Sequence, residues 1–232
     1  MNRTGALTVQ GSADVGIPLD SGRKYAKINY QKETDRVLEG LHDRPRLLLH
    51  SCCGPCSSYV LEYLSKSFDI TVFYYNPNIR PEEEFVKRLE NQKKLLNEMR
   101  PEGACAEPVA PPYDPAPFEE IARGMEDLPE GGARCLRCYR LRLEKTAEYA
   151  ASHGFEWFCT TLSVSPHKNA EALNRIGEET AEKYGLRYLP SDFKKRSGYL
   201  RSIRLSEQYG LYRQNYCGCT PPAAETEKDG SR

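Results

Sequence analysis

The sequence predicts an α/β fold built around a parallel sheet with a Rossmann-like βαβ core. Residues 46–50 (RLLLH) form a short apolar run, and residues 70–75 (ITVFYY) are rich in β-branched and aromatic side chains. Both patterns are typical of buried strands. A helical segment follows each run, and this alternation indicates parallel strands joined by right-handed crossovers. In such sheets, ligands bind beyond the carboxyl ends of the strands.

Each element in the first half has a recognisable beginning or end. Apolar residues at helical spacing predict a helix over residues 28–42. Pro55 and small polar residues open the helix that includes residues 59–64, after the first strand. Pro81 and three glutamates open a long helix that reaches Met99, because carboxylates are stabilised at the positive end of the helix dipole.

The second half begins with a proline-rich segment. Residues 101–131 hold seven of the sixteen prolines, which predicts an ordered loop or insertion with a short helix near residues 118–125. Further elements are expected as helices over 136–153 and 169–184, strands over 155–161 and 186–189, and a helical C-terminal part.

Length and composition bound the class of protein. The 232 residues suit one α/β catalytic domain, which we expect over residues 28–219, between a disordered N-terminal lead (1–27) and a disordered tail (220–232). Thirty-three basic residues balance thirty-three acidic ones, so net charge alone gives no argument for nucleic-acid binding. No apolar run approaches the ~20 residues of a membrane span, and no signal peptide is visible. We therefore expect a cytoplasmic protein.

Nine cysteines without an export signal indicate metal or redox chemistry rather than a disulfide scaffold. Cys52 and Cys53 follow the first strand, and Cys135 and Cys138 form a C-x₂-C pair at a helix start among four arginines. Together they predict a four-thiolate site. Such a site can hold Zn²⁺ or a [4Fe–4S] cluster, and the spacing does not decide between them. The position at a strand end slightly favours the cluster.

The remaining cysteines differ in their expected roles. Cys217 and Cys219 flank a glycine, and a disulfide across so small a loop is strained and easily reduced, which favours a redox-active dithiol over a further pair of metal ligands. Cys56 is equally consistent with a second metal site or a small residue at a helix start. Cys105 and Cys159 are expected to be bystanders, the latter as a buried small hydrophobe.

Two segments near the cysteine pairs are locally basic. Residues 187–213 contain seven basic residues against two acidic ones, and residues 134–145 contain five against one, with tyrosines interleaved in and around both segments. Cations and aromatic rings around a reactive site suit RNA, whose phosphates and unpaired bases they contact. The alternative is a pair of solvated helix faces.

Several motifs together resemble those of the cobalamin-independent epoxyqueuosine reductases. The combination of a Cys-Cys pair, a C-x₂-C pair and a terminal C-G-C is specific, and the resemblance covers residues 28–219. The matching segments are 50–56 (HSCCGPC), 75–78 (YNPN), 113–114 (YD), 131–140 (GGARCLRCYR), 163–168 (SVSPHK), 192–195 (DFKK), 198–201 (GYLR) and 211–219 (LYRQNYCGC).

The resemblance implies a reaction, a fold relative and a set of roles. The family reduces the epoxide of epoxyqueuosine at the tRNA wobble position (34), the last step of queuosine formation, on a HUP-type sheet similar to that of the adenylylsulfate reductases. By that resemblance, a [4Fe–4S] cluster is bound by four cysteines, a redox-active disulfide is formed by two, and an additional iron is held by Cys56 or, less favoured, by Asp114 or Asp192. The four cluster ligands would be Cys52, Cys53, Cys135 and Cys138, and the disulfide pair Cys217 and Cys219.

Reducing an epoxide to an alkene consumes two electrons and two protons, and the C-x-C dithiol is the two-electron reservoir that the side chains offer. An iron acting as Lewis acid and an external reductant of unknown identity complete the hypothesis. Proton donors are expected among His167, Tyr75 and Tyr113, and tRNA phosphates are expected to contact Lys168, Arg201 and Arg213.

Two other functions remain open at this stage. One is a zinc-stabilised RNA-binding module without catalysis, which leaves the C-G-C pair without a purpose. The other is a different tRNA-modifying or sulfur-metabolism enzyme on a related sheet. Against the latter, the turn after the first strand lacks the Gly/Ser-rich pyrophosphate loop that such enzymes need.

Overall fold

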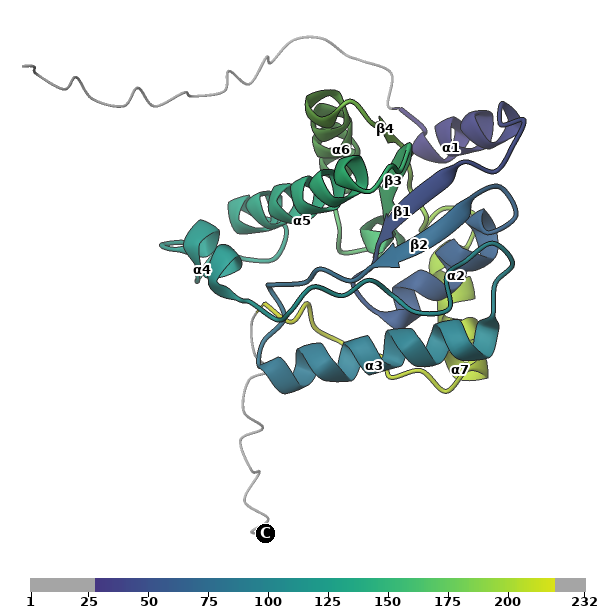
Figure 1. Ribbon diagram of the computed structural model, residues 1–232. Helices are drawn as coiled ribbons and strands as arrows, with labels where there is room; N and C mark the ends of the chain where they lie inside the picture. Colours follow the sequence, from purple (N-terminus) through teal and green to yellow (C-terminus); the bar gives the residue numbers. More distant parts are fainter. Residues whose placement is uncertain (1–27, 220–232) are drawn as a thin grey trace, which may run out of the picture.

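The computed structural model describes residues 28–219 (Figure 1), so the expected N-terminal lead and C-terminal tail lie outside the described residues. The elements alternate as the sequence predicts. In chain order they are α1 (Tyr30–Glu39), β1 (Arg46–His50), α2 (Gly54–Leu64), β2 (Asp69–Phe73), α3 (Glu82–Met99), α4 (Ala116–Ala122), α5 (Ala133–Ser152), β3 (Trp157–Thr160), the 3-10 helix η1 (Thr161–Val164), α6 (Ala170–Tyr184), β4 (Arg187–Tyr188) and α7 (Gly198–Gln208).

The four strands form one parallel sheet in the order β2-β1-β3-β4, which confirms the predicted fold class. Figure 1 shows α2, α3 and α7 on one side of this sheet and α5 and α6 on the other. The contacts of α2 with α3 and α7, and of α5 with α6, agree with these two layers. Both faces are therefore covered, as a parallel sheet requires.

The central strand β1 supplies both halves of the core. Leu47 and Leu49 face the α2 and α3 side with Val60 and Leu95, whereas Leu48 faces the other side. All three leucines are fully buried. Because neighbouring side chains of a strand point to opposite faces, a continuous apolar run is what a strand buried on both faces needs.

The proline-rich segment extends the sheet beyond β2. Ile70 donates to the carbonyl of Gly103, and Val109 donates to the carbonyl of Val72 and accepts from Tyr74. Parallel bridges at Ala104 and Val109 follow the same edge. The prolines are compatible with this place because an edge segment need not donate along its whole length.

Helix α2 starts at Gly54, with Cys53 as its N-cap, one residue before the predicted opening residue Pro55. Helix α5 starts at Ala133, with Gly132 as its N-cap, three residues earlier than the sequence predicts. Both cysteine motifs therefore sit at helix N-termini. Among residues 28–219, no helix is long and apolar enough to cross a membrane.

Candidate active site

A cavity of about 360 Å³ opens at the carboxyl end of β1. The turn after His50 and the start of α2 form its floor, and residues 162–168 after β3 and residues 213–217 near the C-terminus form its walls. This is the edge at which parallel α/β sheets bind ligands. Its volume lies within the range of pockets for small molecules.

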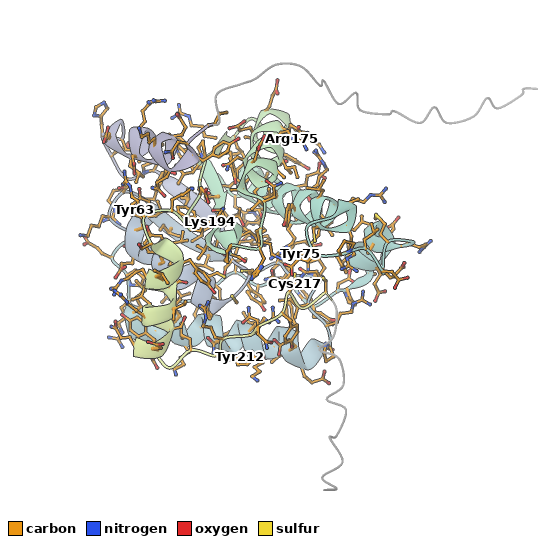
Figure 2. All side chains as sticks on the ribbon, turned by 180° about the vertical axis from the view of Figure 1, so that it is seen from behind. Tyr63, Tyr75, Arg175, Lys194, Tyr212 and Cys217 are labelled. Atoms are coloured by element: carbon orange, nitrogen blue, oxygen red, sulfur yellow. The ribbon has the colours of Figure 1, made fainter. Side chains whose placement is uncertain are left out.

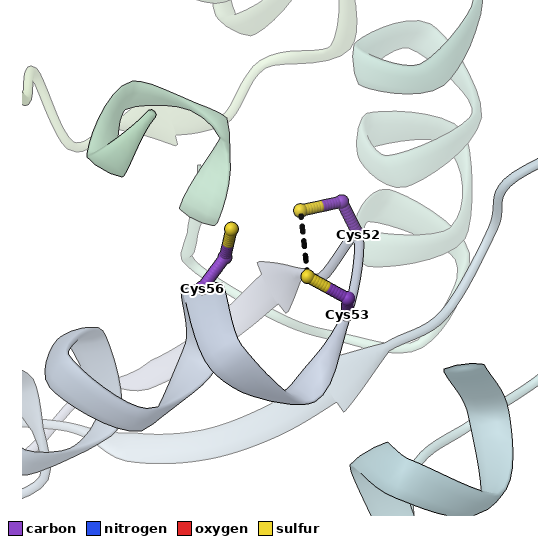
Figure 3. A group of neighbouring side chains, drawn as sticks. All are labelled: Cys52, Cys53 and Cys56. Carbon is purple, nitrogen blue, oxygen red and sulfur yellow. Dashed lines mark hydrogen bonds between the residues drawn. The ribbon is translucent and has the colours of Figure 1, made fainter. Parts of the chain in front are cut away.

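Three thiols gather at the floor of this cavity (Figure 3). The sulfurs of Cys52, Cys53 and Cys56 lie within 4.8 Å of one another and point toward a common space. Cys52 and Cys53 are 3.7 Å apart, Sγ to Sγ. The chain bends at Cys52, and Cys53 is extended before the helix begins. The two neighbouring side chains end on the same side.

The turn that carries these thiols is held by buried hydrogen bonds. Ser51 Oγ donates to Gln92 Oε1 of α3 (2.7 Å) and lies 2.6 Å from Ser57 Oγ, while Asn76 Nδ2 donates to the carbonyl of Ser51 (2.9 Å). At Gly54, a Cβ would come within 2.9 Å of the backbone of α3, so α2 approaches α3 closely there. The cavity floor is thus fixed by elements on both sides of the turn.

The three thiols share their protons unequally. Hydrogen bonds from Cys53 and Cys56 hold the pKa of Cys52 well below its usual range, and buried Arg142 adds to this effect. The same hydrogen bond to Cys52 raises the pKa of Cys53 to about 12, and the pKa of Cys56 also lies well above its usual value. One thiolate accepting two S–H groups describes this arrangement.

Arg142 is the buried cation at the centre of the site. It is 2% exposed, it donates to His50 Nε2 (3.2 Å) and Asn76 Oδ1, and its NH1 lies 4.0 Å from Cys138 Sγ. Burial, followed by the charge of Arg142, lowers the pKa of His50 to about 3, so this imidazole is neutral. In the sequence, Arg142 is one of the four arginines near the C-x₂-C pair. Its spacing of four residues from Cys138 puts both on one helix face, which is the signal that could have found it.

The C-x₂-C pair lies beside this group and not within it. Cys135 and Cys138, in the first two turns of α5, border a second, narrow cavity that is also lined by Cys217 and Cys219. Cys138 packs with Phe118 of α4. In the expected ligand set these two join Cys52 and Cys53, whereas the third sulfur of the compact group is Cys56.

Cys217 borders both cavities, and it lies near the middle of the view in Figure 2. Lys168 Nζ donates to its sulfur (3.3 Å), and Arg88 NH1 donates to its carbonyl (3.1 Å). A hydrogen bond from Cys219 is the main cause that holds the pKa of Cys217 well below its usual range, and Lys168 contributes.

The glycine between these two cysteines is required by geometry. Gly218 has φ +97°, a conformation that favours glycine, and a Cβ there would approach the guanidinium of Arg88 to 3.1 Å. Its carbonyl accepts from the backbone N–H of Arg80 (3.0 Å). The terminal C-G-C segment is therefore anchored to the N-terminal half of α3 and the loop before it.

The expected RNA-contacting cations divide into two groups. Lys168 and Arg213 line the larger cavity, and the Arg213 guanidinium stacks 5.4 Å from the centre of the Tyr199 ring. Arg201 instead forms a two-pronged ion pair with Glu62 (2.5 and 2.9 Å) and is not among the residues that line the cavity.

The expected acids and proton donors also separate. His167 lines the larger cavity. Tyr113 donates to the carbonyl of Ile79, and Tyr75 stacks on Phe73, so neither lines it. Asp114 and Asp192 are likewise outside the compact thiol group: Asp114 accepts from the backbone of Ala116 at the start of α4, and Asp192 pairs with Lys194. Cys159 is fully buried in the core, as expected.

Comparison with known proteins identifies the family. A family model described as "Epoxyqueuosine reductase QueH" matches residues 47–225. The chain belongs to the QueH family. Similar relatives, each named "Epoxyqueuosine reductase QueH", occur in Staphylococcus epidermidis (41% identity, 84% of this chain and 85% of the relative), Streptococcus pyogenes serotype M1 (42%, 83% and 77%) and Thermotoga maritima (38%, 75% and 88%). Membership favours an oxidoreductase over the two alternative functions.

The thiols of this QueH chain fit a metal site. Two thiolates on one tetrahedral ion, with metal–sulfur bonds of about 2.3 Å, lie about 3.8 Å apart, and the Cys52–Cys53 separation is 3.7 Å. Sulfur donors select zinc, copper(I) and iron–sulfur clusters rather than hard cations. Arg142 and the side-chain amide of Gln214, which donates to Cys53 Sγ (3.3 Å), offset the negative charge that thiolates bring. The compact group could therefore hold a metal.

Proposed function

We propose that this chain reduces the epoxide of epoxyqueuosine at position 34 of tRNA to the alkene of queuosine, with Cys217 and Cys219 as the redox-active pair. The observation that carries the proposal is the position of Cys217, which borders both the substrate-sized cavity and the cavity lined by Cys135 and Cys138. A dithiol at that place borders both a bound substrate and the Cys135–Cys138 pair.

The dithiol balances the reaction. When two cysteine sulfurs become a disulfide they release two electrons and two protons. The epoxide takes up the same number as both carbon–oxygen bonds break, a carbon–carbon double bond forms and oxygen leaves as water. An external two-electron reductant then returns the disulfide to the dithiol for the next turnover.

The metal site completes the proposal. Cys52, Cys53, Cys135 and Cys138 would hold a [4Fe–4S] cluster, with Cys56 as the ligand of an additional iron. Bound there, these groups supply an electron-transfer route and a Lewis acid for the epoxide oxygen. Cys53, Cys135 and Cys138 are buried and Cys52 is half-buried, and the two pairs line two cavities that share Cys217, which supports this assignment.

The larger cavity suits a polar nucleobase. Three buried polar atoms at its wall have no hydrogen-bond partner within the described chain: Asn78 Oδ1, Arg88 NH2 and Gln214 Oε1. Buried polar groups are normally satisfied, so such atoms mark where a ligand with several donors and acceptors would bind. The stacked Arg213 and Tyr199 supply a cation and a ring for the anticodon loop. His167, which lines the cavity, is the proposed proton donor.

The proposal is tested by metal analysis and turnover assays on protein purified without air. We expect iron and acid-labile sulfide, and we expect Cys217→Ser to abolish multiple turnover of tRNA that contains epoxyqueuosine. Cys105→Ser is the matched control, because Cys105 lies outside both cavities and its sulfur accepts from the backbone of Val72. Zinc without sulfide, or full turnover by Cys217→Ser, would contradict the cluster or the dithiol, respectively.

A further inference from the structure

Lys168 lies in an unusual place for a residue that the sequence assigns to phosphate binding. Its side chain is only 9% exposed, and its ammonium group lies 3.3 Å from Cys217 Sγ and 2.5 Å from Glu130 Oε1. It stands in the turn between η1 and α6, where its backbone N–H donates to Ser165. Its charge is therefore directed inward, to a sulfur and one carboxylate.

Burial makes the partners of this ammonium important. An ammonium group removed from water needs negative charge close by. Glu130 is 45% exposed, so solvent screens much of its contribution. The Cys217 sulfur lies on the buried side, and its ionised form supplies the remaining negative charge.

Other groups around Cys217 either favour the ionised form of its sulfur as well or carry no charge. Arg142 adds a second buried cation, and Arg88 donates to the backbone carbonyl of Cys217 rather than to its sulfur. A hydrogen bond with Cys219 also favours the ionised form of the Cys217 sulfur. Tyr139 lines the same narrow cavity and is un-ionised, because burial raises its pKa to about 12. Cys138 also lines that cavity, as a proposed ligand of the cluster.

We propose that Lys168 is a positioning residue that holds Cys217 as the thiolate of the dithiol, leaving Cys219 as the protonated partner. This inference rests on the proposed redox role of the pair. It assigns an order to the two cysteines: Cys217 is the nucleophilic sulfur, and Cys219 is the sulfur that closes the disulfide. Lys168 thereby serves the dithiol rather than a tRNA phosphate.

The step balances with this assignment. The Cys217 thiolate and the Cys219 thiol form one sulfur–sulfur bond and release two electrons and one proton. The epoxide accepts the two electrons, that proton and one further proton from solvent, and its oxygen leaves as water. The external dithiol or equivalent reductant later breaks the disulfide and restores the thiolate beside Lys168.

The test measures the thiolate itself. Reduced, metal-loaded protein is treated with iodoacetamide across a pH series, and the alkylated fraction of Cys217 is read from its tryptic peptide by fragmentation mass spectrometry. For Lys168→Met we expect the midpoint for Cys217 to rise by about one pH unit, which makes alkylation about tenfold slower at pH values below the midpoint of the natural chain. Lys168→Arg should keep the original profile, because it keeps the charge.

Controls separate this inference from its alternatives. Lys183→Met removes an exposed lysine that pairs with Glu144 (3.4 Å) and should leave the profile unchanged. Glu130→Gln should leave the Cys217 midpoint unchanged or lower it, because the lysine loses its competing partner. An unchanged profile in Lys168→Met, or a profile in which Cys219 reacts before Cys217, would overturn the inference. Full multiple turnover by Cys217→Ser would instead overturn the underlying redox role.

Discussion

The buried pair of Glu84 and Arg88 offers a sharp test of how the C-G-C segment is supported. Arg88 Nε donates to Glu84 Oε1 at 2.6 Å, and the two side chains are 8% and 2% exposed. Arg88→Met leaves a buried carboxylate with only tyrosine hydroxyls as its side-chain partners, those of Tyr212 (3.3 Å) and Tyr216, and Glu84→Gln leaves a buried guanidinium without its anion. Removing one member of a buried pair costs about 3–5 kcal/mol in free energy of unfolding.

The double variant separates stability from function. Replacing both members by apolar residues of similar size, Glu84→Leu with Arg88→Met, removes both charges, and such replacements are often close to neutral for stability. The carbonyl of Cys217 still loses its donor, so we expect the double variant to regain the stability of the natural chain while turnover stays low. The physical reason is that Arg88 reaches the site through its hydrogen bond to Cys217 and through its NH2 at the cavity wall, whereas the ion pair itself does not.

The assay is anaerobic urea denaturation followed by circular dichroism, on preparations with equal metal content, beside multiple-turnover rates. A decrease of less than about 1 kcal/mol in the free energy of unfolding of Arg88→Met would refute the reasoning, because a buried carboxylate without its cation should destabilise the fold by more than that. A double variant as unstable as the sum of the two single variants would refute it as well.

Two further predictions use matched pairs of variants. Gly177→Ala should lower the free energy of unfolding by about 1–3 kcal/mol in thermal or urea unfolding, because its Cβ would lie 2.4 Å from the Tyr188 ring, whereas Gly40→Ala meets nothing closer than 3.5 Å and should be nearly neutral. Arg213→Gln should weaken tRNA binding and make the slope of log K against log salt concentration shallower by about 0.7. Arg201→Gln should change neither quantity, because Arg201 is already paired with Glu62. Equal effects of the two substitutions in filter binding at several salt concentrations would contradict this.

Much of the fold could be predicted because its signals are local. Apolar runs at 46–50 and 70–75 became β1 and β2 to within one or two residues, since a strand buried on both faces needs an unbroken apolar sequence. Pro55 marked the start of α2 to within one residue, because proline is favoured in the first turn of a helix. The start of α5 was placed three residues too late, because its N-cap Gly132 has no capping side chain to signal it.

The candidate site could be predicted in chemistry but not in arrangement. The cysteine spacing indicated metal and redox chemistry, and the carboxyl ends of the strands indicated where it would lie. The spacing left open whether Cys56 joins Cys52 and Cys53, which the bend at the start of α2 decides, and it did not indicate that Arg142 stands at the centre. The place of Arg142 depends on how α5 packs against β1.

The sequence by itself determined the α/β class, the family and the kinds of sulfur chemistry, because each is carried by residues close together in the chain. Only the tertiary structure decided which charges are used and for what. Arg88 meets the Cys217 backbone across 129 residues and Lys168 meets the Cys217 sulfur across 49. The sequence does not show whether an arginine or lysine in a basic segment faces solvent or a thiol. Burial decides between the two, and burial is a property of the packed fold.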